Sequence, residues 1–110
     1  MPKPPKDFCI DDFIYEEFIK DGWNGAGYEP PIIIKNARID RGSEYSSSAS
    51  GKQLLYNSLI FCYEGITTPI PTFKEQSKIV FDGKEHIITK VIPIYEAYDK
   101  VIYSYELEVV

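Results

Sequence analysis

The residues whose types suit catalysis are few and widely spaced. His86 is the only histidine in the chain, and its neighbour Glu85 is the nearest carboxylate in sequence. Consecutive side chains of a strand point to opposite faces, so the two residues make a poor acid–base pair. We interpret His86 as a solvated strand residue. A zinc site is not expected, because the chain has one histidine and no Cys-x-x-Cys motif.

Cys9 and Cys62 are the two cysteines, and 53 positions separate them. This spacing matches no metal-binding motif. One disulfide is possible, but we expect two reduced thiols.

An acidic cluster near the start of the chain suggests either a cation site or paired catalytic carboxylates. Its members are Asp11, Asp12, Glu16, Glu17 and Asp21. They lack the spacing of a calcium-binding loop, and we interpret the cluster as a solvated acidic face.

The serines and glycines also match no catalytic motif. The serines between positions 43 and 50 have no Gly-x-Ser-x-Gly context, and GWNGAG at 22–27 lacks the Gly-Lys-Ser/Thr ending of a phosphate loop. We therefore expect no catalytic residue, no metal and no cofactor. The chain is predicted to be a non-enzyme that acts through protein contacts.

Composition indicates one globular domain. The 110 residues are 44% hydrophobic and 15% aromatic, with nine tyrosines and eight prolines. This length can bury one core, aromatic residues favour strands, and prolines oppose a helical bundle. The net charge is −5, with no basic half. Tight phosphate binding is therefore not expected. We expect instead a surface that repels DNA.

The ends of the chain suggest no export or anchoring. Residues 1–7 form a Pro- and Lys-rich arm that we expect to be flexible, and residues 8–110 form a single β domain. The arm is a candidate docking segment, and the residues assigned to it are Pro2, Lys3, Pro4, Pro5 and Lys6. We find no signal peptide and no apolar run of about 18 residues, so no membrane contact is expected.

Alternation of apolar residues predicts most of the strands. Residues 32–40 (IIIKNARID) read as a strand with Ile33, Ala37 and Ile39 on one face, and 54–64 as a strand buried on both sides. Asp82-Gly83 predicts a hairpin over 78–92 with a two- or three-residue turn, ended by Pro93. Residues 101–110 read as a half-buried terminal strand. Residues 8–21 fit a helix and a strand equally well.

Two segments read as loops. Residues 21–31 contain three glycines and two prolines. The second, a Ser/Gly-rich loop, is long for so small a domain, and such loops are usually functional or disordered. We treat it as a candidate assembly or channel loop, consisting of Gly42, Ser43, Glu44, Tyr45, Ser46, Ser47, Ser48, Ala49, Ser50, Gly51 and Lys52.

Five to seven short strands with frequent turn signals predict an all-β fold, a small antiparallel barrel or sandwich with the long Ser/Gly loop. The hairpin at 78–91 and the strand at 101–109 are expected to form its stable centre.

The chain resembles the minor capsid proteins of tailed bacteriophages, which are similar to head-closure (stopper) and head–tail connector proteins. The stretches that carry the resemblance are IDDFIYEEF, PPIIIKNARID, LIFCYEGITTPIPTF, KIVFDGKEHIITKV and YSYELEVV, which together span most of residues 10–110.

The resemblance implies a barrel-like fold, a strand at 12–19, and a place in the virion after assembly in the host cytoplasm. It also implies a ring below the portal, with portal, adaptor and tail proteins as partners and DNA passing without specific binding. The alternative function is an OB-like module that stacks single-stranded nucleic acid on Tyr56, Tyr63, Tyr103 and Tyr105, or binds another protein. An isolated subunit is expected to be largely monomeric.

Overall fold

The structure is a computed structural model that describes residues 6–22, 25–42, 44–48, 51–97 and 100–110. Strands dominate the described residues, and their only helical segment is one short 3₁₀ turn. The elements are η1 (Lys6–Phe8), β1 (Asp11–Glu16), β2 (Phe18–Gly22), β3 (Gly25–Tyr28), β4 (Ile32–Asp40), β5 (Glu44–Ser48), β6 (Gly51–Tyr56), β7 (Ser58–Tyr63), β8 (Lys78–Phe81), β9 (Lys84–Tyr95) and β10 (Ile102–Val109). No described helix is long and apolar enough to cross a bilayer.

Six of these strands close into an antiparallel barrel in the order β1-β4-β7-β10-β9-β8. Pairing of β1 with β8 completes the circle, with Ile14 opposite Val80. The prediction of a mainly β fold is therefore confirmed, and a barrel is found in place of a sandwich. Closure satisfies the backbone of both edge strands, so the barrel has no free sheet edge.

The barrel interior holds one continuous apolar core. Its buried members come from every barrel strand and from one loop, and they are Phe13, Tyr15, Ile34, Ala37, Ile39, Ile60, Cys62, Phe73, Ile79, Phe81, Ile88, Leu107 and Val109. Leu107 is buried in a strand, as predicted, and three residues of the β8–β9 hairpin are buried with it, namely Ile79, Phe81 and Ile88, whereas most of β9 is half-buried or exposed. That 78–91 and 101–109 form the stable centre stays a prediction.

Phe73 is the core residue that comes from a loop, the connection between β7 and β8. Its ring lies edge-on to Tyr15 at 5.2 Å and to Tyr105 at 5.5 Å. The Tyr15 hydroxyl accepts a hydrogen bond from the Lys74 amide (3.0 Å) and shares one with Ser77 (3.3 Å). These contacts hold the connection, which has no strand of its own, against the barrel.

A bulge at Asn36 changes the faces predicted for residues 32–40. Asp11 pairs with Ala37 but Phe13 pairs with Ile34, so β4 has one extra residue there. Asn36 adopts a positive φ of 61°, which asparagine tolerates better than most residues. The bulge brings Ile34 inside together with Ala37 and Ile39. Ile33, predicted to share their face, points outward and is 59% exposed.

The Asp82-Gly83 turn has two residues. Phe81 pairs with Lys84, and both turn residues have positive φ, as a type I′ turn requires. The predicted end of this strand at Pro93 is wrong, because β9 continues to Tyr95. Pro93 lies beyond the residues of β9 that pair with β8, in a part where β10 is the neighbouring strand. A proline there disturbs at most one ladder.

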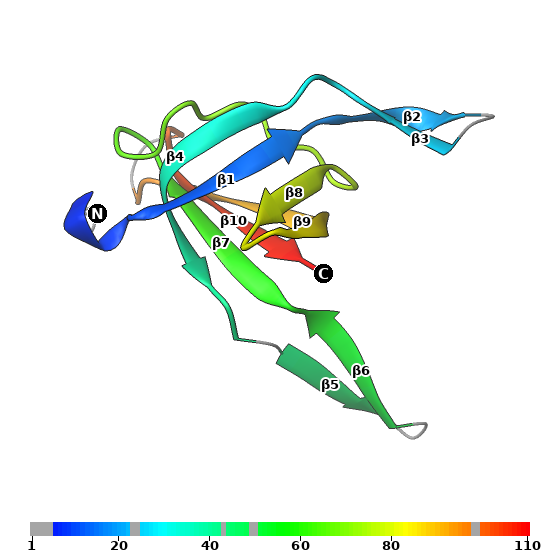
Figure 1. The fold of residues 1–110 in the computed structure, drawn as a ribbon. Helices are drawn as coiled ribbons and strands as arrows, with labels where there is room; N and C mark the ends of the chain where they lie inside the picture. Colours follow the sequence, from blue (N-terminus) through cyan, green and yellow to red (C-terminus); the bar gives the residue numbers. More distant parts are fainter. Residues whose placement is uncertain (1–5, 23–24, 43, 49–50, 98–99) are drawn as a thin grey trace.

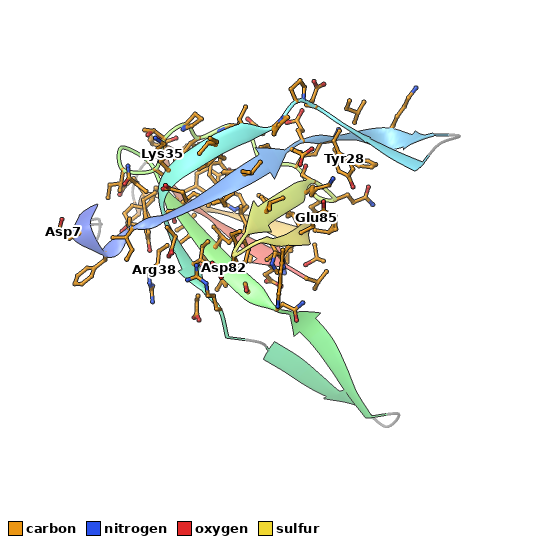
Figure 2. The ribbon with its side chains drawn as sticks, in the orientation of Figure 1. Asp7, Tyr28, Lys35, Arg38, Asp82 and Glu85 are labelled. Carbon is orange, nitrogen blue, oxygen red and sulfur yellow. The ribbon has the colours of Figure 1, made fainter. Side chains whose placement is uncertain are left out.

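Both segments predicted as loops contain β-hairpins. Residues 21–31 include the end of β2 and all of β3, which pair with each other, and Tyr28 lies at the base of this hairpin (Figure 2). Residues 42–52 contain β5 and the start of β6, which also pair. The strand predicted over 54–64 is divided at Asn57 into β6 and β7. At 8–21 the strand alternative is correct.

The two hairpins extend away from the barrel in different directions (Figure 1). The β2–β3 hairpin continues from β1 and returns to β4, and the β5–β6 hairpin lies between β4 and β7 in the chain. The radius of gyration is 14.9 Å, larger than the roughly 13 Å of a compact domain of about 100 residues. The molecule is therefore a small barrel with two projections.

Candidate functional site

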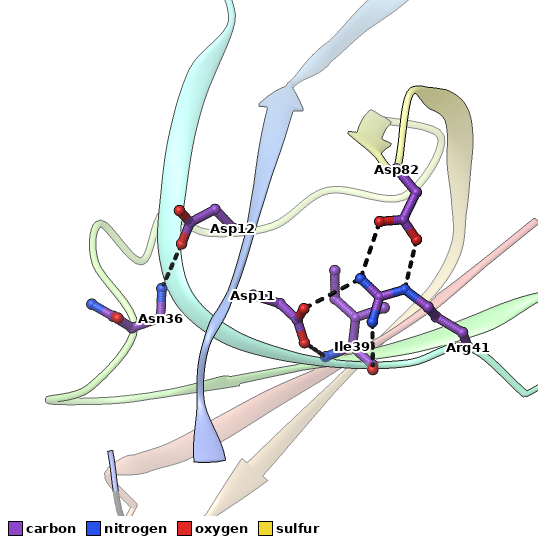
Figure 3. Close-up of polar contacts among 6 residues, drawn as sticks. All are labelled: Asp11, Asp12, Asn36, Ile39, Arg41 and Asp82. Carbon is purple, nitrogen blue, oxygen red and sulfur yellow. Dashed lines mark hydrogen bonds and ion pairs between the residues drawn. The ribbon is translucent and has the colours of Figure 1, made fainter. Parts of the chain in front are cut away.

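A polar cluster lies at the root of the β5–β6 hairpin. Arg41, which follows β4, binds Asp82 through Nε at 2.6 Å and Nη2 at 3.2 Å. The same Nη2 lies 3.2 Å from Asp11 of β1 (Figure 3), and the guanidinium lies 5.7 Å from the Phe81 ring centre. Arg41 thus joins three elements at the barrel end that carries the hairpin. Its hydrogen bonds lower the pKa of Asp82.

Two residues of the acidic cluster stabilise the bulge in β4. The Asp11 carboxylate accepts a hydrogen bond from the Ile39 amide (2.9 Å), and the Asp12 carboxylate accepts one from the Asn36 amide (3.2 Å; Figure 3). Glu16 lies 4.0 Å from the Lys78 ammonium. These carboxylates have structural partners. Within the described residues, no group of three or more His, Cys, Asp or Glu is arranged to hold a metal ion.

The candidate assembly loop is, in its described part, a two-stranded hairpin. Glu44–Ser48 forms β5, and Gly51 and Lys52 begin β6. Gly42 precedes the hairpin and donates its amide to the Asp40 carboxylate at 3.1 Å. Ser43, Ala49 and Ser50, which were also assigned to this loop, lie outside the described residues. The prediction of a loop is therefore wrong for the described part of this segment, whose backbone forms paired strands. Serines can pair in a strand even though they provide little apolar area.

The candidate docking arm falls almost entirely outside the described residues. Residues 2–5 lie there, and Lys6 begins the 3₁₀ turn η1. Two large apolar side chains next to the arm are exposed, namely Phe8 at the end of η1 and Ile10.

An apolar row on the outer surface of the barrel is a feature that the sequence analysis missed. Ile33 of β4, Ile14 of β1 and Val80 of β8 are direct neighbours across three strands. They line a groove of about 380 Å³, together with Asp12, Phe13, Phe81 and Gly83. The sequence signal was present as three consecutive isoleucines, but only the bulge reveals which of them point outward.

Charged side chains border this row. Lys78 lies between Glu16 and Glu85, at 4.0 and 3.7 Å, on one side, and Asp12 lies at the other end. Figure 2 shows Glu85 and Asp82 on the β8–β9 side of the barrel. An apolar strip with a polar border is typical of a surface that contacts another protein.

The aromatic residues proposed to stack on nucleic acid do not form one platform. Tyr63 and Tyr103 pack edge-to-face at 5.9 Å, and Arg38 lies 5.2 Å from the ring centre of Phe61 on the same side. Tyr105, however, packs on Phe73 against the core. Tyr56 belongs to β6, and the structure does not describe its side chain.

His86 and the cysteines have structural surroundings. His86 is half-buried and stacks on Phe81 at 4.3 Å, so the interpretation as a solvated residue needs correction. Burial, followed by the nearby Lys84, lowers its pKa. Cys9 and Cys62 are buried free thiols, as expected, and burial raises the pKa of both. Thiols of this kind are poor nucleophiles at neutral pH.

A small closed barrel with projecting hairpins and an apolar outer row offers surfaces suited to contact with other proteins. Comparison with known proteins gives the family. The minor capsid protein family matches residues 5–109, and the chain belongs to it. It is thus a structural protein of the phage virion, held there by contacts with other virion proteins.

One curated relative is also a phage protein. Over 80 residues the chain is 29% identical to a protein described as "Uncharacterized protein ORF5" of Lactococcus phage LL-H, covering 70% of this chain and 68% of that protein. No solved structure matches the chain.

Proposed function

We propose that the chain is a head–tail connector or head-closure subunit, which forms a ring below the portal together with further copies. The observation that carries the proposal is the β5–β6 hairpin, a two-stranded projection on a closed barrel in a minor capsid protein. A closed barrel cannot extend its sheet into a neighbour, so assembly must use outer faces and projections.

The hairpin is suited to contacts between subunits. A two-stranded hairpin is only marginally stable in water without further packing. In sequence it carries Tyr45, Leu54, Leu55 and Tyr56, with Tyr45 opposite Leu54 in the register. Apolar residues in so thin an element gain most when another protein covers them.

The charge suits a channel through which DNA passes. The net charge of −5 gives little attraction for phosphates, and like charge lowers the affinity of DNA for the wall. DNA then passes without specific binding. The same charge, with Tyr105 packed in the core, weighs against the OB-like alternative.

The test is a deletion of the hairpin in the phage that encodes the chain. Removal of residues 43–56 leaves Arg41, Gly42, Asn57 and Ser58 as a short connection after the last barrel pair, Asp40 with Leu59. Shortened protein should keep its thermal stability, whereas phage that carries it should leak DNA or lack tails in electron micrographs.

A matched control keeps the hairpin length and replaces Ser46 and Ser47 by threonine, which favours strands. This phage should be infectious. Antibody labelling of intact particles should place the chain at the tail-bearing vertex. If the shortened phage packages DNA and joins tails normally, or if the label lies over the whole shell, the connector proposal is wrong.

A further inference from the structure

The apolar row Ile33–Ile14–Val80 has no cover within the described chain. Ile33 is 59% exposed, and the groove that it lines has mostly apolar walls. Phe13 and Phe81 line the same groove, although both belong to the buried core. A groove of about 380 Å³ accepts one or two large side chains.

The chain itself contains a segment of the matching kind. The β5–β6 hairpin combines a short strand pair with four large apolar or aromatic residues in its sequence, and it pairs with no barrel strand in the described topology. The hairpin extends away from its own barrel (Figure 1).

Charge favours the hairpin of a second copy, rather than the groove of a second copy, as the partner that covers the groove. Residues 43–56 contain one anion, Glu44, and one cation, Lys52, so the hairpin adds no net charge. Two grooves face to face would instead bring together the carboxylates of Asp12, Glu16 and Glu85 from both copies, and the Lys78 ammonium contacts two of these three. Carboxylates brought together in this way would repel one another.

We propose that the β5–β6 hairpin of one copy docks in the groove formed by Ile33, Ile14 and Val80 of a second copy. This deepens the proposed connector function and rests on it. Hairpin and groove are different surfaces, so the contact is head-to-tail and repeats around an axis, which closes a ring when the rotation fits.

The contact is weak for a single pair. A groove that takes one or two side chains buries far less than the roughly 800 Å² per partner of a stable interface. Dilute protein is therefore monomeric, and copies join when a platform holds them side by side and raises their effective concentration.

Photo-cross-linking of the purified full-length chain tests the contact without reference to its place in the virion. With p-benzoyl-phenylalanine in place of Tyr45 and the protein highly concentrated, irradiation should give dimers whose linked peptides contain residues 12–14, 33 or 80–83. Mixing ¹⁴N- and ¹⁵N-labelled protein distinguishes links between copies from links within one.

Ile33→Glu should abolish these dimers, since it places a carboxylate in the groove, and because Ile33 is 59% exposed the variant should still fold. Val101→Glu is the matched control, because Val101 is 61% exposed and lies outside the groove. It should leave the yield unchanged, and circular dichroism checks that both variants fold.

Dimers that persist in Ile33→Glu, links within one chain, links to other segments, or no links at all would overturn the docking proposal. Vertex labelling of particles decides the connector function separately. A chain found at the vertex with links elsewhere leaves the connector function intact and removes only this contact.

Discussion

Arg41 and Asp82 form a two-bond ion pair that joins the end of β4 to the β8–β9 turn, across 41 positions of sequence. The side chain of Arg41 is 45% exposed and that of Asp82 is 53% exposed. Water and salt therefore screen the pair, and its contribution to folding stability is small. The role of the ion pair is geometric, because it fixes the barrel end from which the β5–β6 hairpin projects.

The Arg41–Asp82 ion pair should make folding stability depend on pH in the acidic range. Arg41 lowers the pKa of Asp82 in the folded state, so the stabilisation is present above the ordinary aspartate pKa near 4 and is lost as the pH falls through the folded-state value. The melting temperatures of the wild type and Asp82→Asn should differ at pH 7 and converge once the pH falls below the lowered folded-state pKa of Asp82. Glu75→Gln, at an exposed carboxylate in the β7–β8 connection, should show no such difference.

His86 should give a second pH dependence, in a higher range. Burial against Phe81 lowers its pKa, so the folded state favours the neutral ring. Stability is complete above the unfolded pKa of about 6.5 and falls as the pH drops through the folded value. Denaturant melts should show a falling free energy of unfolding as the pH drops below about 6.5, the unfolded-state pKa, toward the lowered folded-state pKa. His86→Phe keeps the stacking and should flatten this slope, and a slope that survives the substitution would contradict the explanation.

Asn36→Val should destabilise the barrel by about 1–3 kcal/mol, because a β-branched residue is strained at positive φ. Asn36→Gly should stay within about 1 kcal/mol of the wild type. Urea denaturation measures both values. Lys35→Val, at the exposed neighbouring position of β4, controls for the change to valine. Equal losses for Asn36→Val and Lys35→Val would show that the bulge carries no strain.

Leu107→Ala should cost about 2–5 kcal/mol, since Leu107 is fully buried at the centre of β10. Equilibrium unfolding in urea measures the loss. Val101→Ala, just before the same strand at an exposed site, should change stability little. A loss below 1 kcal/mol for Leu107→Ala would mean that the barrel collapses around the cavity or that β10 is not its centre.

Local patterns predicted the elements whose signals are strong over short distances. Asp82-Gly83 predicted the hairpin because the positive φ angles of its turn depend only on these two residues. The alternation over 101–110 predicted β10. Residues 32–40 were placed on a strand, but the faces predicted for Ile33 and Ile34, which precede the bulge, were reversed relative to Ala37 and Ile39. One residue of bulge reverses a face, and nothing in the alternation of neighbouring side chains shows where that residue lies.

The two hairpins were missed for a related reason. Glycine in 21–31 and serine in 42–52 lower strand propensity, and no buried face compensates for them in the sequence. Their pairing depends on the barrel strands that hold both ends together. The groove was missed because Ile14, Ile33 and Val80 meet through barrel closure, which no single segment encodes.

The β5–β6 hairpin is inserted between β4 and β7, so its length can change without altering the core of the barrel. Two residues added to each of β5 and β6 would lengthen the hairpin by about 7 Å and leave every side chain on its original face, whereas one would exchange the faces. We therefore expect related chains to differ in this hairpin by even increments. Such changes would fit the same barrel to rings of different diameter.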